Sequence, residues 1–199
     1  ELDVKGSYLP INQRPGSLEW LTKCDSFPYQ PQEWDLEFEH TRCVNRLINI
    51  IGLTPDVGLR LDEALAAQKA PNFWFGKTRN DLYDFFDAWL VFQPSPDDAR
   101  VYMDRFYEFA GESPGLEVIA IPEFIHWLHD FMLARGSYQD SQESAAIVPQ
   151  WMEDPNIDMD DFQVPAGGFQ SFNEFFTRDL LPGRRPIAEQ TDTTVLVSR

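Results

Sequence analysis

The segment from Gly167 to Ile187 constrains the fold more than any other stretch, because it carries the start, one face and the end of a helix. Ser171 follows two glycines and is placed as an N-cap, with Glu174 three residues later completing a capping box. Apolar residues recur at spacings of three and four and are predicted to share one helical face: Phe172, Phe175, Phe176 and Leu180. Pro182-Gly183 predicts the end of this helix, and Thr193–Val197 reads as a β-strand.

This segment also resembles a family phrase. The string FNEFFTRDLLPGRRPI, followed by VLVS, is similar to the entry segment of the phosphatidylserine decarboxylase family, which has the form FxxFFxRxLxPGxRPI. The matching residues are expected to be structural signature positions: Phe172, Phe175, Phe176, Arg178, Leu180, Pro182, Gly183, Arg185, Pro186 and Ile187. A weaker likeness at Gly6–Pro10, Trp20-Leu21 and Asp158–Phe162 resembles the helical domain that precedes the decarboxylase in some members, including fungal aromatic-amino-acid (tryptophan) decarboxylases.

Arg178 and Arg185 are the polar residues of this phrase that we single out. A guanidinium offers five donors in a fixed fork, so both are placed to be held by buried carboxylates or carbonyls. We interpret them as structural contacts that orient the helix on the following sheet, rather than as substrate ligands.

The sequence departs from the family where the catalytic residues would follow. The family continues Ser-Pro-Ala-Asp-Gly, with the aspartate in its maturation triad, whereas this sequence reads Ser198-Arg199. The self-cleavage signature Leu-Gly-Ser-Thr is absent too, since Gly6-Ser7, Gly16-Ser17 and Gly136-Ser137 all lack a following threonine. The resemblance implies a covalent pyruvoyl group that takes up electrons as carbon dioxide leaves. We therefore expect no catalytic or cofactor-binding residue here, no activity by this chain alone, and a downstream catalytic domain as its partner.

Three functions remain open. The first is the N-terminal part of a phosphatidylserine-decarboxylase-like, pyruvoyl-dependent decarboxylase, a carboxy-lyase that makes phosphatidylethanolamine in phospholipid biosynthesis. The second is the same family acting on a soluble aromatic amino acid such as tryptophan. The third is a stand-alone, non-catalytic binding module. A reading frame that continues beyond Arg199 into Pro-Ala-Asp-Gly would favour the first two.

Charge and cysteine content exclude several partners. The formal net charge is -17, and the acidic excess precedes residue 170, because residues 170–199 hold four basic and four acidic residues. Such a surface repels nucleic acid and anionic lipid headgroups, so we expect neither nucleic-acid binding nor membrane contact by this region. No stretch reaches the roughly 20 apolar residues of a transmembrane helix. Two cysteines, Cys24 and Cys43, fit a reducing, cytoplasmic compartment, with reduced thiols favoured over a single bridge.

Upstream spacing predicts a mainly α fold: an orthogonal helical bundle over 1–160, then the lead-in helix and first strand of a truncated α+β decarboxylase domain over 161–199. Residues 1–33 are expected to form an extended arm with a short helix at 17–23. Helices are expected at 34–52, 54–69, 78–92, from 95 to about 111, 122–136 and 141–152. A turn is expected at Pro114-Gly115. The predicted core comprises Leu47, Ile51, Leu82, Phe85, Phe86, Trp89, Phe106, Leu128 and Phe131.

Three further patterns have competing interpretations. Glu123, His126 and His129 could bind zinc or iron, but Glu123 and His129 diverge around the helix axis, and we expect no metal. The acidic loop 153–161, with Asp158, Asp160 and Asp161, has neither the spacing nor the glycine of a calcium loop, so a solvated linker is favoured. Phe73-Trp74-Phe75 could bind a ligand or partner, although aromatic residues are more often core.

Overall fold

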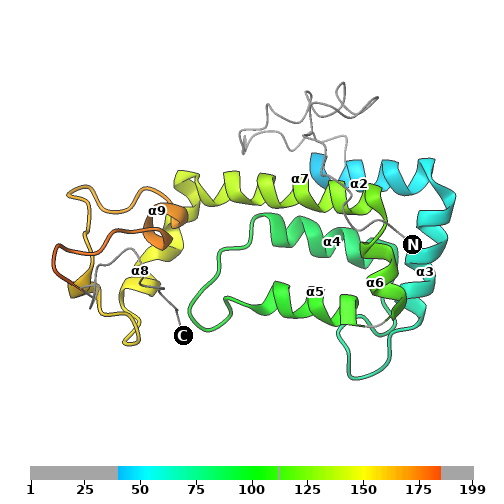
Figure 1. Ribbon diagram of the computed structural model, residues 1–199, viewed down its shortest axis with the longest axis horizontal. Helices are drawn as coiled ribbons and strands as arrows, with labels where there is room; N and C mark the ends of the chain where they lie inside the picture. The colour runs from blue at the N-terminus through cyan, green and yellow to red at the C-terminus, as the bar shows by residue number, and fades with distance from the viewer. Residues whose placement is uncertain (1–39, 112, 185–199) are drawn as a thin grey trace, which may run out of the picture. The chain divides into compact units, whose positions relative to one another are not determined.

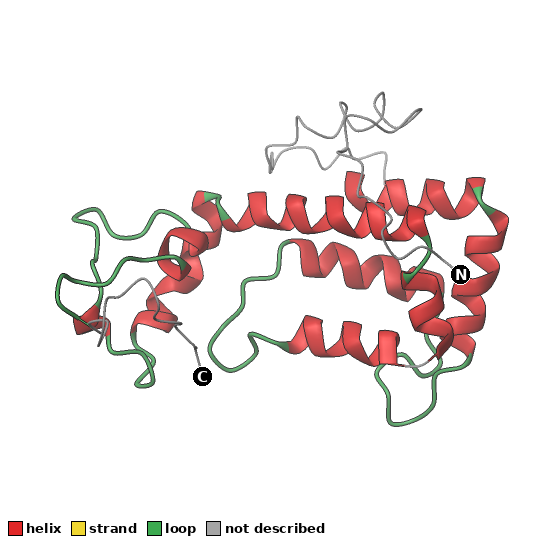
Figure 2. Ribbon diagram, in the orientation of Figure 1, coloured by secondary structure: helices red, strands yellow, loops and turns green. Residues whose placement is uncertain are grey.

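The computed structural model describes residues 40–111 and 113–184, and its regular structure in these ranges is helical (Figure 2). The expectation of a mainly α protein is confirmed. Extended pairing in these ranges is limited to one isolated antiparallel bridge between Phe162 and Leu180. The arm at 1–33, the helix at 17–23 and the strand at Thr193–Val197 lie outside the described residues. The orthogonal arrangement of the bundle stays a prediction.

The described chain divides into two compact units. Unit 1 contains residues 40–92 and 100–138, apart from 112, and unit 2 contains residues 93–99 and 139–184. Each unit has its own cluster of buried apolar side chains. The predicted functional domains, with their boundary at residue 160, stay a prediction.

Unit 1 begins with three helices whose first turns follow from local sequence: α2 (Arg42–Leu53), α3 (Pro55–Ala66) and α4 (Arg79–Leu90). The Thr41 hydroxyl accepts a hydrogen bond from the Val44 amide, at 3.3 Å, and caps α2. Pro55 opens α3, where its missing N–H costs nothing. Thr78 and Asp81 form a full capping box on α4: the Thr78 amide donates to the Asp81 carboxylate at 2.8 Å, and the Asp81 amide donates back to the Thr78 hydroxyl.

Three more helices complete unit 1: α5 (Val101–Gly111), α6 (Ser113–Ile119) and α7 (Pro122–Gln139), the last of which ends in unit 2. The α4 helix lies between α7 and α5 (Figure 1). The fully buried Phe86 ring on α4 packs edge-on against Trp127 of α7, with ring centroids 4.7 Å apart, and against Phe106 of α5 at 6.2 Å. Aromatic rings therefore join the three helices on both sides of α4.

The predicted core agrees closely with the structure. Of its members, Phe106 and Leu128 are partly buried and pack against the core, and the others are buried. Within the Phe73–Phe75 run, Trp74 is fully buried and its indole N–H donates to the Arg105 carbonyl at 2.6 Å, as the core interpretation requires. Phe75 is 60% exposed, so that interpretation is wrong for the last ring of the run.

Several predicted boundaries are wrong. The helix expected from Ser95 begins at Val101, because the Asp98 carboxylate accepts from the Ser95 amide and hydroxyl at 2.7 and 2.6 Å and closes a turn instead. The turn expected at Pro114-Gly115 is the start of α6, where proline is tolerated in a first turn. The α3 helix ends at Ala66 rather than near residue 69, and α7 continues to Gln139 rather than ending at 136.

Unit 2 is built from short elements: the 3-10 helix η2 (Gln142–Ile147), α8 (Val148–Met152), the 3-10 helix η3 (Met159–Asp161) and α9 (Phe172–Phe176). The single helix expected over 141–152 is divided, since its first half is 3-10 and Pro149 sits in the first turn of α8. The buried Ser144 hydroxyl of η2 accepts from the Phe172 amide at 2.9 Å and so connects η2 to α9.

Candidate functional site

The predicted capping residues do start α9. The Ser171 hydroxyl accepts from the Glu174 amide at 3.0 Å. The Glu174 carboxylate accepts from the amide of Gln170, one residue earlier than a standard capping box would have it. The Gly168 backbone, with φ of +73°, adopts the left-handed conformation just before this start.

The α9 helix is shorter than predicted and does not bury all of its apolar residues. It ends at Phe176, where Thr177 caps its C-terminus, so Arg178 and Leu180 lie beyond the helix. Phe172 and Phe175 are buried, but Phe176 is 68% exposed. The single apolar face predicted for these rings is therefore wrong at Phe176, because consecutive helical residues point about 100° apart.

Arg178 is held against aromatic rings and a backbone carbonyl. Its guanidinium carbon lies 4.1 Å from the Phe162 ring centroid and 4.2 Å from the Phe175 ring centroid. One terminal nitrogen donates to the Phe175 carbonyl at 2.8 Å. The cation–π contacts with the two rings link the end of α9 to Phe162, which precedes the helix. The sequence predicted a carboxylate or carbonyl as the partner of Arg178, and the Phe175 carbonyl is such a partner.

The chain then folds back and turns. The Gln163 amide donates to the Asp179 carbonyl, and the Leu181 amide donates to the Asp161 carbonyl, both at 2.8 Å, on either side of the Phe162–Leu180 bridge. The Arg184 amide donates to the Leu181 carbonyl at 3.1 Å across Pro182-Gly183, and Gly183 has φ of +81°. Proline followed by a left-handed glycine is the sequence of a type II turn. The signature positions Arg185, Pro186 and Ile187 lie outside the described residues.

The histidines of α7 do not form a metal site with their neighbours. No group of three His, Cys, Asp or Glu residues in the described ranges is arranged to hold a metal ion. The His129 ring nitrogen Nδ1 lies 3.5 Å from the Asp130 carboxylate, and its side chain is 60% exposed. Glu123, His126 and His129 are thus spread along the helix rather than gathered around one point.

A polar cluster that sequence reasoning missed lies at the start of α2. The Asp87 carboxylate contacts the His40 ring nitrogen Nδ1 at 2.8 Å and accepts from the Thr41 amide and hydroxyl at 3.1 and 2.5 Å. The hydroxyl donates to the carboxylate rather than to the imidazole, so it is not oriented as an activated nucleophile. This cluster fixes the N-terminus of α2 to α4. Thr41 and Asp87 lie 46 positions apart in the sequence, so no local sequence pattern could predict their contact.

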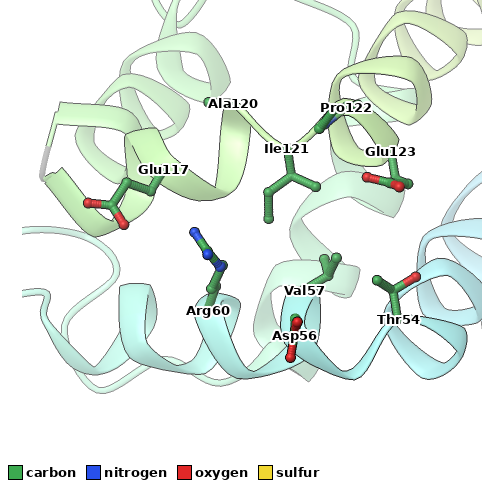
Figure 3. Close-up of a pocket in the computed structure, with 9 residues that line it drawn as sticks. All are labelled: Thr54, Asp56, Val57, Arg60, Glu117, Ala120, Ile121, Pro122 and Glu123. Atoms are coloured by element: carbon green, nitrogen blue, oxygen red, sulfur yellow. The ribbon is translucent and has the colours of Figure 1, made fainter.

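An open groove of about 450 Å³ lies between α3 and the junction of α6 and α7 (Figure 3). Val57 and Ile121 supply apolar side chains to it, and Val57 is buried. Arg60 extends from α3 toward α6, between Glu117 and Ile121 (Figure 3). The groove therefore combines apolar side chains with charges of both signs, an arrangement that can bind a small polar ligand.

Comparison with known proteins supports the family that the sequence resembles. The chain is 32% identical over 102 residues to "Phosphatidylserine decarboxylase proenzyme" of Clostridium botulinum (strain Alaska E43 / Type E3), covering 51% of this chain and 33% of that protein. It is 40% identical over 106 residues to the protein of the same name from Clostridium novyi (strain NT), with the same two shares. These matches support a phosphatidylserine-decarboxylase-like family. "Phosphatidylserine decarboxylase proenzyme 3" of Schizosaccharomyces pombe (strain 972 / ATCC 24843) is 37% identical over 71 residues, covering 36% of this chain and 7% of that protein.

The likeness to phosphatidylserine decarboxylase proenzymes is partial in length. The chain spans a third or less of the length of the three relatives named here. No family model and no solved structure matches it. Among the helices of the described ranges, none is both long and apolar enough to span a bilayer.

Proposed function

We propose that this chain is the N-terminal part of a phosphatidylserine-decarboxylase-like enzyme, and that the catalytic residues lie elsewhere in that protein. The observation that carries this proposal is the 32–40% identity to several proteins named phosphatidylserine decarboxylase proenzyme. The resemblance of the segment Phe172–Gly183 to the family phrase also supports it, and Phe172 and Phe175 of that segment are buried in the core of unit 2.

The one Gly-Ser pair that the structure describes supports a catalytic centre outside residues 40–184. A pyruvoyl group would be made from a serine at a cleavable Gly-Ser bond, and Gly136-Ser137 is the one such pair in the described ranges. Ser137 lies within α7, and its hydroxyl donates to the Leu133 carbonyl at 3.1 Å, one turn earlier. A serine fixed in regular helix does not fit the role of a self-cleaving residue. The other two pairs, Gly6-Ser7 and Gly16-Ser17, lie outside the described residues.

The reaction that we propose for the whole protein is decarboxylation of phosphatidylserine to phosphatidylethanolamine. A pyruvoyl group would supply the carbonyl that takes up the electrons released with carbon dioxide. For this chain we propose a structural role: α9, its Arg178 contact and the turn at Pro182-Gly183 lead the backbone toward a catalytic domain.

The test uses the natural full-length protein that contains these residues. We expect mass spectrometry to show self-cleavage into two chains. We also expect release of labelled carbon dioxide from carboxyl-labelled phosphatidylserine, and neither event in residues 1–199 alone. An Arg178→Met variant should reduce the amount of cleaved protein, whereas Arg100→Met, which removes an exposed arginine, should not. A full-length protein that neither cleaves itself nor releases carbon dioxide would refute the proposal.

One observation favours a second substrate enough to include it in the assay. The net charge of -17 disfavours approach to anionic lipid, so a soluble aromatic amino acid such as tryptophan is the alternative substrate of the same chemistry. Carbon dioxide released from tryptophan but not from phosphatidylserine would select it. A stop codon directly after residue 199 would instead favour a non-catalytic binding module.

A further inference from the structure

The α7 helix has an apolar face that the described part of the chain leaves in solvent. Ile125, Met132 and Leu133 are exposed on it, although large apolar side chains gain free energy from burial. Together with His129 they follow the spacing i, i+4, i+7 and i+8, so they share one face of the helix. The opposite face packs into the core of unit 1 through three buried rings: Phe124, Trp127 and Phe131. A contiguous exposed apolar row of this kind indicates a surface that another segment covers.

The acidic residues of α7 do not place a free negative charge on this face. Asp130 pairs with the Arg46 guanidinium of α2, with a nitrogen–oxygen distance of 2.5 Å. Glu123 is rotated about 160° around the helix axis from Ile125, since consecutive helical residues are about 100° apart. A segment that covers the face can therefore carry acidic residues without meeting an unbalanced carboxylate of α7.

The sequence just before α2 has the pattern that such a covering segment needs. The helix expected from residue 34 begins at Arg42, because Thr41 caps it there. The six residues that precede His40, which lie outside the described residues, alternate strictly between apolar and acidic side chains: Trp34, Asp35, Leu36, Glu37, Phe38 and Glu39. Successive side chains of an extended chain point to opposite sides, so this alternation predicts one apolar side and one acidic side.

The described chain begins close enough to α7 for this segment to reach the exposed face. In the first turn of α2, the Cys43 carbonyl accepts from the Trp127 indole N–H at 2.9 Å, and α2 lies alongside α7 (Figure 1). His40 precedes that turn and is held by the Asp87 carboxylate at 2.8 Å. Six extended residues reach about 20 Å, whereas residues 125–133 cover about 12 Å of a helix about 10 Å across. The segment is therefore long enough to pass around α7 and lie along its exposed face.

We propose that residues 34–39, called the strap below, bind along the exposed face of α7. The apolar side chains of the strap pack on the apolar side chains of that face, and its acidic side chains point to solvent, where their charge stays hydrated. A second copy of the chain is a poorer occupant, because each copy has a net charge of -17 and the two repel each other. The strap contact does not depend on the function proposed above.

Methionine oxidation measures whether this face is covered. Hydrogen peroxide converts an accessible methionine to its sulfoxide. Met132 on α7 is 50% exposed and Met103 on α5 is 43% exposed, so the two should react at similar rates if nothing covers α7. With the strap bound, we expect Met132 of the intact 199-residue chain to oxidise at least about fivefold more slowly than Met103, as a contact of modest stability would give. Mass spectrometry of peptides from the oxidised chain measures both rates.

Two matched variants separate the apolar side of the strap from its acidic side. The first combines Trp34→Ser, Leu36→Ser and Phe38→Ser, and the second combines Asp35→Ser, Glu37→Ser and Glu39→Ser. The first should raise the oxidation rate of Met132 to that of Met103, and the second should leave Met132 protected. Neither variant changes a residue of the described helices, so helical circular dichroism should be unaltered in both.

Three outcomes would overturn the proposal. Met132 could oxidise as fast as Met103 in the unmodified chain, which would mean that the face is open. Met132 could stay protected in the first variant, which would mean that the apolar side of the strap does not cover it. Protection that increases with protein concentration would assign the face to a second copy of the chain instead.

Discussion

At the scale of single residues, Asp81 has the clearest electrostatic perturbation. The Thr78 amide, which donates to its carboxylate, is the largest cause that lowers the pKa of Asp81 to about 2, and the Lys77 ammonium and Thr78 hydroxyl add to this. The pKa lies below the usual value of 3.8, so the carboxylate stabilises the folded state above pH 3.8. That stabilisation is lost as the pH falls through about 2.

We therefore predict that Asp81→Asn lowers the free energy of unfolding by about 1 kcal/mol at pH 7, an estimate reduced for solvent screening because the side chain is 35% exposed. Urea unfolding at pH 7 and at pH 2.5 measures the effect, and the difference between variant and unmodified chain should shrink at the lower pH. Glu63→Gln, an exposed change on α3, is the control. A loss that is equal at both pH values would contradict the electrostatic explanation.

Arg135 is a buried charge that caps the C-terminus of α4 from another helix. Its guanidinium donates to the carbonyls of Trp89, Leu90 and Phe92, the last at 3.2 Å. Burial lowers the pKa of Arg135 to about 10, which leaves it charged at neutral pH. The Trp89 carbonyl also accepts from the Phe92 amide at 3.2 Å, so Arg135 adds donors to a helix end that is already partly satisfied.

We predict that Arg135→Met destabilises the chain by about 3 kcal/mol, because it removes charge-assisted hydrogen bonds from a buried site. Arg135→Lys should recover part of this loss, since one ammonium group reaches fewer carbonyls. Arg100→Met, which breaks an exposed pair with Asp104 on α5, should cost less than about 0.5 kcal/mol. Thermal unfolding of the three variants provides the comparison, and equal losses for Arg135→Met and Arg100→Met would contradict the capping role.

Sequence patterns identify residues whose role is local and miss those whose partners are distant. The Ser171–Glu174 cap was predictable because both residues lie within one turn. Arg135 contacts carbonyls more than 40 positions away, and Asp87 binds Thr41 from 46 positions away. The groove charges were equally hidden, because Arg60 and Glu117 come from different helices.

At the scale of elements, the approach of α6 to α5 depends on a glycine. A Cβ atom added at Gly115 would lie 1.9 Å from the Phe109 carbonyl oxygen and 2.9 Å from its carbon. Both are backbone atoms, which cannot move aside as the end of a flexible side chain can. Gly115, which suggested a turn in the sequence, thus lies where the backbones of α5 and α6 come into close contact.

We predict that Gly115→Ala costs about 2–3 kcal/mol through this overlap. Gly52→Ala in α2 is the matched control: no atom lies within 4 Å of its added Cβ, so alanine should stabilise the helix by up to about 1 kcal/mol. Chemical denaturation measures both, and opposite signs are expected. A neutral Gly115→Ala variant would mean that α5 and α6 are packed less tightly than described.

Elements with repeated apolar spacing were predicted well, and those shaped by turns were not. The α4 helix agrees within two residues because its rings repeat at helical spacing and its cap is local. The α5 start was wrong because Ser95 and Asp98 satisfy each other in a turn. The α9 helix was predicted too long because pairing of Phe162 with Leu180 draws the chain into an extended conformation, a contact between residues 18 positions apart.

At the scale of the whole molecule, the net charge of -17 sets the expected behaviour near lipid. We predict that the 199-residue chain does not co-sediment with phosphatidylserine vesicles, and least of all at low salt, where the Debye length reaches roughly 30 Å. Neutral phosphatidylcholine vesicles at the same two salt concentrations are the control. Salt-sensitive binding to the anionic vesicles alone would contradict the prediction that the acidic chain is repelled by anionic lipid.

Unit 2 draws on two separate parts of the chain, and this has a consequence for how it could be inherited or transplanted. The Trp151 indole N–H donates to the Pro94 carbonyl at 2.6 Å, and the Gln93 amide group donates to the Glu143 carbonyl at 3.2 Å. A gene segment encoding residues 139–184 alone would omit the strip at 93–99 that supplies these contacts. A transplanted unit 2 would therefore need residues 93–99 together with residues 139–184.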